Sequence, residues 1–284
     1  MGSELRRRAL TALAAIAFVG GESGAQAQPI LLRIRPNPGD TLRMRLDQQL
    51  VMTGTTRMGK QDSTRSVTTT TFVRARVVVE RSDPGWTTVL AITDSVDVTH
   101  RSGAAAPYAD PEAPGLLQGK RLRLQISPEG VMKVAENPDG LPEQLQILFG
   151  QLPATLPKEA VAVGQRWTQD VPLPLSEASG EGTVLRTSMR LDSLSREGRI
   201  AYISLNGTFT RDSTRTDDLP PGASLRSTGR LRGTMRIDRM RGWLTESSAT
   251  ITVNSLLTPP PGSPDKPMKF YMKLTQQIRA IDKP

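Results

Sequence analysis

The 284-residue chain has no cysteine and a single histidine. Disulfides and thiol chemistry are therefore excluded, and zinc or copper would lack their usual thiolate and imidazole ligands. A Ser/His/Asp catalytic group would have to use His100. Because His100 follows an alternating segment and precedes an Ala-rich one, we expect it at the surface. We predict no enzymatic activity, no metal site and no cofactor.

Aromatic residues make up only 4% of the chain, which leaves few side chains on which nucleic-acid bases could stack. The formal net charge is +9, but the basic residues are spread singly along most of the sequence. We therefore expect no nucleic-acid partner. Anionic lipid headgroups or polyanionic envelope polymers are favoured as targets of the positive charge.

Long apolar runs are also missing: after the first 27 residues none approaches the ~18 residues of a membrane-spanning helix. The first 27 residues are typical of a secretory signal peptide. Three arginines (6–8) precede an apolar run (9–19), and residues 25–27, Ala-Gln-Ala, match the pattern that a signal peptidase cleaves. We predict cleavage after Ala27 and a periplasmic or secreted mature protein with no transmembrane segment.

The mature chain does show strict alternation of apolar and polar residues. Leu42, Met44 and Leu46 alternate with Arg43 and Arg45. This period of two predicts strands, and a sheet with one apolar and one polar face is typically antiparallel. The same pattern predicts further strands over 72–80, 86–98, 121–126, 131–134, 185–191, 200–209, 230–237, 243–257 and 270–278.

One polar residue interrupts this alternation. Asp94 falls on the same parity as Leu90 and Ile92. It would either line a cavity or be rotated outward by a β-bulge, and we favour the bulge.

The segment 141–150 is the one predicted helix. Pro142 lies in its first turn, Gly150 ends it, and Leu141, Leu145, Leu148 and Phe149 form one apolar stripe. We expect this helix to pack on the apolar face of the sheet, and we expect loops at 102–115 and 259–267.

The predicted fold class is therefore all-β and mostly antiparallel: a large curved sheet or open barrel with one short central helix. Residues 28–284 are expected to form a single β-rich domain. A faint internal duplication suggests two similar halves, 28–140 and 151–284, joined by the helical segment 141–150.

Two short motifs resemble an uncharacterised bacterial envelope family. The family, a domain of unknown function numbered 6263, pairs an early Pro-Gly-Asp with a central Leu-Pro…Val-x-Val-Gly…Trp segment. Here residues 38–40 and 156–167 match these motifs. The resemblance implies a secreted β-rich protein and supplies no catalytic residues. The architecture is also similar to that of periplasmic lipoprotein carriers.

Three function classes follow. A binding module for an apolar or amphiphilic envelope ligand comes first, a structural or protein-interaction component of the envelope is the alternative, and an enzyme is the least favoured. The expected partners are lipid or another envelope protein. The residues predicted to line a ligand cavity are Met44, Leu46, Leu90, Ile92, Leu124, Leu145, Leu148, Phe149, Met235 and Met272.

Overall fold

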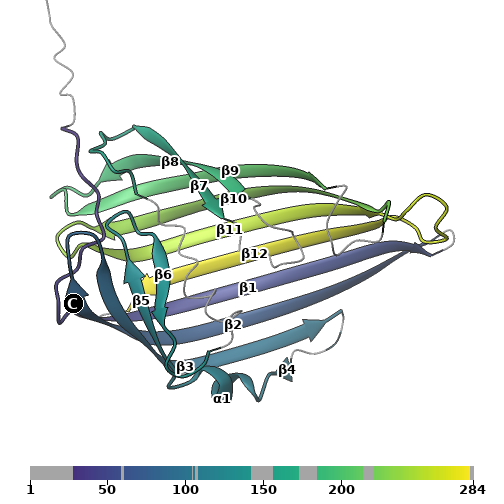
Figure 1. Ribbon diagram of the computed structural model, residues 1–284, viewed down its shortest axis with the longest axis horizontal. Helices are drawn as coiled ribbons and strands as arrows, with labels where there is room; N and C mark the ends of the chain where they lie inside the picture. The colour runs from purple at the N-terminus through teal and green to yellow at the C-terminus, as the bar shows by residue number, and fades with distance from the viewer. Residues whose placement is uncertain are drawn as a thin grey trace, which may run out of the picture.

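The computed structural model describes residues 28–58, 61–103, 105, 108–141, 156–172, 184–213 and 221–281. These residues form one large curved antiparallel sheet with the strand order β6-β5-β3-β2-β1-β12-β11-β10-β9-β8-β7, and β4 pairs with β3 (Figure 1). The strands are β1 (Thr41–Met58), β2 (Gln61–Ser82), β3 (Thr87–Ser102), β4 (Tyr108–Ala109), β5 (Arg121–Ile126), β6 (Met132–Glu136), β7 (Arg166–Pro172), β8 (Val184–Leu194), β9 (Ile200–Ser213), β10 (Ser224–Asp238), β11 (Trp243–Thr258) and β12 (Met268–Ala280).

The predicted fold class is confirmed. Every strand pair is antiparallel, and β6 and β7 are the two edges of the strand order, so the ladders do not close the sheet into a ring. The pairing of β1 with β12 joins the early and late parts of the chain, because Leu46 lies opposite Ile278. The sequence halves therefore contribute to one continuous sheet.

The register defines two faces of the sheet. Residues directly opposite each other in an antiparallel pair point to the same side, so Val73, Leu46 and Ile278 share one face. All three are buried in the main hydrophobic core. We call this side the inner face; it lies on the concave side of the sheet in Figure 1. The opposite side, the outer face, carries many charged and polar residues, with Arg43 opposite Arg76 and Arg45 opposite Arg74.

The N-terminal segment 29–36, here called the strap, crosses one end of the sheet. The amide of Ile34 donates to the carbonyl of Pro128 at 2.8 Å, and that of Arg35 donates to the carbonyl of Gly242 at 2.8 Å. Ile30 forms an antiparallel bridge with Val161. Leu32 and Ile34 are buried in the main core, so the strap closes this end by apolar packing as well as by hydrogen bonds.

Two glycines permit close approaches that a side chain would prevent. Gly242 has φ +60°, and a Cβ there would lie 2.3 Å from the Arg35 carbonyl oxygen. Gly229 lies beneath the Phe209 ring of the neighbouring strand, and a Cβ would lie 1.9 Å from it. The first glycine admits the strap, and the second lets an aromatic ring cover the backbone of β10.

We call the end of the sheet with the strap the strap end. The other, where β1 meets β2 and β11 turns into β12, is the tip end. The predicted strands are present and several are longer than expected; β2 begins at Gln61 rather than at residue 72.

Some local expectations were wrong or fall outside the described residues. The expected loop 102–115 contains the short strand β4 and the first residues of helix α1 (Ala113–Leu117). Of the predicted helix 141–150, only Leu141 is described, and it is buried in the main core. Within the described ranges, no helix is long and apolar enough to cross a membrane.

Candidate functional site

The inner face of the strap half encloses a small apolar cavity. Its volume is about 90 Å³, comparable to the share of roughly three water molecules in the liquid. Strands β1, β2, β3, β5, β6 and β12 supply most of the wall, and Trp243 at the start of β11 completes it. The lining residues are Met44, Leu46, Val73, Ala75, Val77, Val89, Ala91, Leu124, Ile126, Met132, Trp243 and Ile278.

Trp243, one of the lining residues, carries an unsatisfied polar atom. The side chain is 5% exposed, and its indole Nε1 is buried without a hydrogen-bond partner. A buried tryptophan N–H normally has an acceptor, because leaving it unpaired costs free energy. The unpaired donor can therefore serve a ligand that carries a hydrogen-bond acceptor.

Trp243 also forms the wall of a second, polar hollow at the strap end. This hollow has a volume of about 760 Å³, and its lining includes Asp40, Arg43 and Arg241. One side chain thus separates a polar, partly cationic hollow from an apolar cavity. This arrangement fits a molecule with a polar head and an apolar chain.

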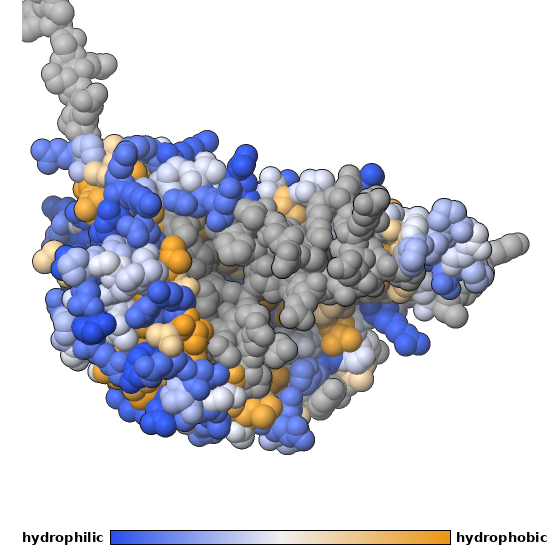
Figure 2. Space-filling model, viewed as in Figure 1, coloured by the Kyte–Doolittle hydropathy of each residue, from blue (hydrophilic) through white to orange (hydrophobic). Residues whose placement is uncertain are grey.

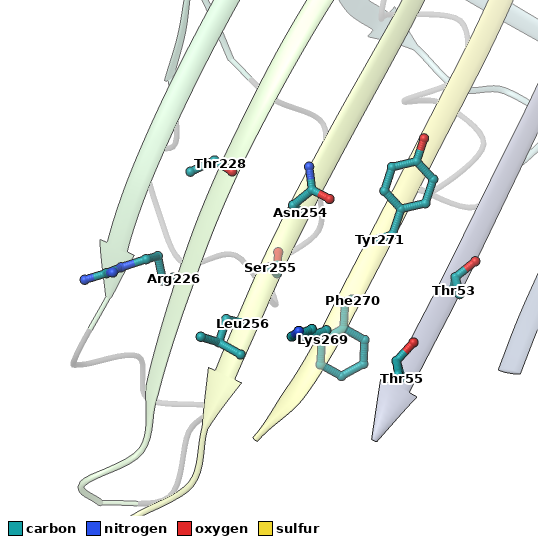
Figure 3. Close-up of a pocket in the computed structure, with 10 residues that line it drawn as sticks. All are labelled: Thr53, Thr55, Arg226, Thr228, Asn254, Ser255, Leu256, Lys269, Phe270 and Tyr271. Atoms are coloured by element: carbon teal, nitrogen blue, oxygen red, sulfur yellow. The ribbon is translucent and has the colours of Figure 1, made fainter. Parts of the chain in front are cut away.

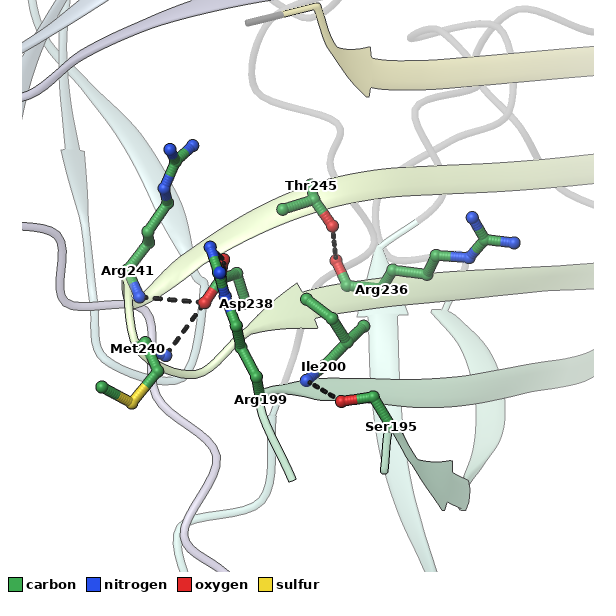
Figure 4. Close-up of polar contacts among 8 residues, drawn as sticks. All are labelled: Ser195, Arg199, Ile200, Arg236, Asp238, Met240, Arg241 and Thr245. Atoms are coloured by element: carbon green, nitrogen blue, oxygen red, sulfur yellow. Dashed lines mark hydrogen bonds and ion pairs between the residues drawn. The ribbon is translucent and has the colours of Figure 1, made fainter. Parts of the chain in front are cut away.

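A polar network beside Trp243 holds the turn between β10 and β11 (Figure 4). Asp238 lies opposite Trp243 in the register. Its carboxylate accepts hydrogen bonds from the backbone amides of Met240 at 3.0 Å and Arg241 at 3.1 Å. The same carboxylate forms an ion pair with Arg199 at 2.7 Å. Burial by itself would raise the pKa of the Asp238 carboxyl, but these donors together lower it below its usual value. The ionised carboxylate therefore fixes the turn from which Trp243 emerges.

The inner face changes character halfway along the sheet. Gln48 of β1 lies opposite Gln276 of β12, and the Gln48 Oε1 is buried without a hydrogen-bond partner. Beyond this pair, toward the tip end, the inner face becomes apolar again with Leu50 opposite Leu274. Polar side chains thus interrupt the apolar surface at this point, and Thr71 of β2 lies opposite Gln48 on the same face.

The tip half of the inner face carries several apolar side chains that are incompletely covered. Met52 lies between Val67 of β2 and Met272 of β12, and Met52 and Val67 are 52% and 44% exposed. Phe270 packs near Gly54 and is 38% exposed. In the space-filling view, separate orange side chains appear among blue and white ones (Figure 2). Contiguous exposed apolar surface of this kind commonly marks a binding surface.

The structure brings some of the predicted lining residues together. Met44, Leu46 and Leu124 line the cavity. Met235 belongs to the main core, and Met272 packs against a second cluster around Leu231 and Val253. Leu145, Leu148 and Phe149 lie outside the described residues.

Leu90 and Ile92 do not reach the cavity. The pairing of β2 with β3 shifts between Arg74/Ser95 and Ala75/Thr93, which leaves Asp94 as the extra residue of a β-bulge. Asp94 is rotated outward and pairs with Arg76 at 2.7 Å, so the predicted bulge is confirmed.

The same bulge reverses the parity of β3. Val96 and Val98 face inward with Ala91 and Val89, whereas Leu90 lies opposite Arg123 and Ile92 opposite Arg121 on the outer face. Placing these two residues on the lining was wrong because the alternation was continued unshifted through Asp94. Reversing the parity at that residue would have identified Val89 and Ala91 instead.

The single histidine lies on the inner face rather than at the open surface. His100 Nδ1 is 3.1 Å from the Thr69 hydroxyl, and its Nε2 is 3.5 Å from a carboxylate oxygen of Asp110. The order hydroxyl, imidazole, carboxylate resembles a nucleophilic triad. However, Thr69 and His100 are opposite each other in the β2–β3 ladder, whose amides are engaged between strands and cannot form an oxyanion hole. We interpret the contact as structural.

Within the described part of the chain, no group of three or more His, Cys, Asp or Glu side chains is placed to hold a metal ion. Several titratable side chains form ion pairs on the outer face, such as Arg123 with Glu80 at 2.7 Å and Arg121 with Asp139 at 3.0 Å.

No family model matches this chain, and no curated protein matches it. Among solved structures, the chain is similar to lipovitellin from a study of lipid–protein interactions, with 10% identity and a TM-score of 0.53. The match covers 87% of this chain and 25% of the lipovitellin chain, so this protein spans about a quarter of that length. The likeness concerns the fold alone.

Two proteins of Pseudomonas aeruginosa match less closely. One is OccK5 (OpdH), which is 8% identical and matches with a TM-score of 0.30 over 86% of this chain and 99% of the OccK5 chain. The other is the outer membrane protein OprG, which is 7% identical and matches with a TM-score of 0.20 over 87% of this chain and 99% of the OprG chain. Scores this low carry no structural argument.

Proposed function

We propose that the protein is a non-enzymatic binding module for an amphiphilic molecule of the cell envelope. The observation that carries the proposal is the apolar cavity lined in part by Trp243, whose buried indole N–H has no hydrogen-bond partner. An apolar chain would occupy the inner face, and its polar head would accept a hydrogen bond from Trp243. The lipid–protein interactions in that study are those of lipovitellin. The likeness in fold supports the proposal that a curved sheet of this kind can hold a lipid.

The methionines of the cavity support a ligand with a flexible chain. Met44 and Met132 lie in its wall. Unbranched thioether side chains can change rotamer to fill or vacate a space, so they let a small cavity expand around an acyl chain. The cavity of about 90 Å³ is then the resting volume of a site that enlarges on binding.

The location outside the cytoplasm is part of the proposal. It is supported by the signal-peptide pattern of residues 1–27, with the expected mature N-terminus at Gln28. The motifs at 38–40 and 156–167 support membership of the envelope family numbered 6263. An exported protein would meet lipids and other amphiphiles as its most abundant apolar ligands.

A fluorescence experiment tests the proposed function. The Trp86→Phe/Trp167→Phe double variant retains Trp243 as its one tryptophan. Titration with a long-chain fatty acid brominated along its chain should quench Trp243 emission saturably, because quenching by bromine requires contact. Addition of Trp243→Phe should weaken uptake of a fluorescent fatty acid about two- to tenfold, which corresponds to the loss of one hydrogen bond.

Trp86→Phe alone is the matched control, since Trp86 lies outside the cavity lining and contacts Lys133 instead. This variant should take up the fluorescent fatty acid like the unmodified protein. Absence of saturable uptake by all forms would overturn the proposal. It would favour the alternative, a structural or protein-interaction component, for which the dense burial around the small cavity already provides some support.

A further inference from the structure

The outer face of the sheet is divided into two electrostatic halves. On β2, β3 and β5, arginines are neutralised by nearby acids: Arg76 pairs with Asp94, and Arg123 pairs with both Glu80 and Glu136. Surface pairs of this kind contribute little to stability, but they cancel charge. This half of the outer face therefore presents a mixed surface with little net charge.

The half formed by β10, β11 and β12 has few acids. The outer positions of β10 between residues 226 and 236 hold only arginine and threonine. The outer positions of β12 between residues 269 and 279 hold lysine, arginine, tyrosine, threonine and glutamine. Glu246, at the strap end of β11, is engaged by Arg236 at 2.7 Å. Toward the tip, no ion pair of the described residues involves Arg230, Arg232, Lys269 or Lys273.

These cations lie in register across the strands. Arg230 of β10 and Lys273 of β12 both lie opposite Thr252 of β11. With neighbouring strands about 4.8 Å apart, their backbones are separated by about 10 Å. Uncompensated cations at this spacing produce a positive field over the tip half of the outer face, which attracts a surface carrying many negative charges.

The tip end adds apolar groups to this positive surface. A hollow of about 400 Å³ is lined there by Arg226, Leu256, Lys269 and Tyr271, among others (Figure 3). Leu256 lies between Arg226 and Lys269 in the register, and Leu256 and Tyr271 are 36% and 37% exposed. Phe270 also lines the hollow and is similarly exposed.

We propose that the tip ends of β10, β11 and β12 dock on an anionic lipid bilayer. Lys269 and Lys273 would contact the phosphates of the headgroups, while Leu256 and Tyr271 would enter the interfacial layer. Basic residues beside tyrosine and aliphatic side chains are the combination that interfacial membrane contacts use. A soluble polyanion would match the charge but would leave the exposed apolar residues without a use, so the observations favour a bilayer.

Docking in this way would also bring the exposed part of the inner face to the membrane. Met52 and Phe270 lie at the same end of the sheet as the proposed contact. If the inner face holds an amphiphile, the tip end is where that molecule would pass to or from the bilayer. The docking itself rests on the outer face and does not depend on the proposed ligand.

Vesicle co-sedimentation tests the docking. The purified protein should bind vesicles of phosphatidylcholine mixed with the anionic phosphatidylglycerol and should bind vesicles of phosphatidylcholine alone only weakly. Added salt should release the protein from the anionic vesicles, because a shorter Debye length screens the attraction between opposite charges. Each basic residue near an anionic surface contributes about fivefold to binding. The Lys269→Glu/Lys273→Glu variant should therefore lose at least about 20-fold in partition coefficient.

A variant with the same charge change at the strap end is the control. Lys158→Glu/Arg166→Glu alters two exposed residues far along the sheet from the tip and should reduce binding much less. Equal losses in both variants would show that binding follows net charge alone and would overturn the assignment to the tip. Circular dichroism would confirm that both variants keep the sheet.

A third variant tests the apolar part of the contact. Tyr271→Trp, made in a Trp86→Phe/Trp167→Phe/Trp243→Phe background, should shift its emission to the blue on anionic vesicles, because its ring would leave water. An unshifted emission, or binding to dextran sulfate without binding to vesicles, would overturn the membrane proposal; the second result would identify a polyanionic polymer as the partner. Since vesicle binding and fatty-acid uptake are separate measurements, either proposal can fail without the other.

Discussion

At the scale of single residues, Asp238 shows how one buried charge can organise a turn. Its carboxylate joins Arg199 of the β8–β9 turn to the backbone amides of Met240 and Arg241 (Figure 4). The side chain is only 3% exposed, so water cannot replace these partners. The alternating pattern of the sequence revealed nothing of this role, because Asp238 follows the last apolar residue of its strand and reads as an ordinary turn residue.

The first prediction concerns Asp238. Because its pKa is lowered in the folded protein, the carboxylate contributes stability that is fully present above the pKa of the unfolded chain, about 3.9, and is lost as the pH falls through the folded pKa. Asp238→Asn should lower the free energy of unfolding by about 1–3 kcal/mol near neutral pH. The difference from the unmodified protein should shrink below about pH 4.

Urea denaturation across this pH range measures the effect. Asp170→Asn is the control, because Asp170 and its partner Arg186 are both more than half exposed and such pairs contribute little. A difference for Asp238→Asn that stayed constant down to acidic pH would contradict a role for its charge.

At the scale of elements, the strap explains how an open sheet closes one end of its core. Its two leucines have opposite environments although they are adjacent: Leu32 is completely buried and Leu31 is 50% exposed. The strap is anchored to the β5–β6 turn through Pro128 and to the β10–β11 turn through Gly242. Its contribution is therefore one of packing across elements that are far apart in the sequence.

The second prediction compares these neighbours. Leu32→Ala should lower the free energy of unfolding by about 2–5 kcal/mol, because it leaves a cavity in a packed core. Leu31→Ala should change it by no more than about 0.5 kcal/mol. Thermal or urea denaturation of both variants provides the comparison. Equal effects would mean that the strap does not pack on the sheet in solution.

At the scale of the whole molecule, stability must come from strand pairing and apolar burial. The chain has no cysteine, and the pairing of β1 with β12 brings together segments more than 200 residues apart in numbering, Met44 with Ala280 among them. Apolar burial extends from the strap to the second cluster around Phe209 and Leu231. The chain offers no thiol to a redox change, and among the described residues no cluster of His, Asp or Glu side chains is placed to hold a metal ion.

The third prediction follows from this. Neither EDTA nor a reducing agent should change the melting temperature beyond measurement error, because nothing that stabilises the described fold is removed by them. Differential scanning calorimetry with and without each reagent is the measurement. A decrease of several degrees with EDTA would reveal a carboxylate calcium site and would contradict the expectation.

Much of the architecture was predictable from local pattern. Alternation at period two identified most strands and the antiparallel sheet, since a strand with one apolar face has few other ways to bury it. The break at Asp94 predicted a bulge for the same reason. Three of the residues predicted to line a cavity, Met44, Leu46 and Leu124, do line one, because they lie on strands whose parity is unbroken.

Other features were decided only by tertiary structure. The alternation with a period of two shows which residues share a face of one strand, but it does not show which strands are neighbours. The pairing of β1 with β12, which unites both halves of the chain in one sheet, depends on long-range register. The outward position of Leu90 and Ile92 depends on a shift relative to β2. Trp243, whose indole N–H is unpaired, lines the cavity because the fold places it beside strands that are distant in the sequence. Arg230 and Lys273 lie on one charged surface for the same reason. Alternation along a chain is a local property, whereas register, cavities and surface charge arise from contacts between segments.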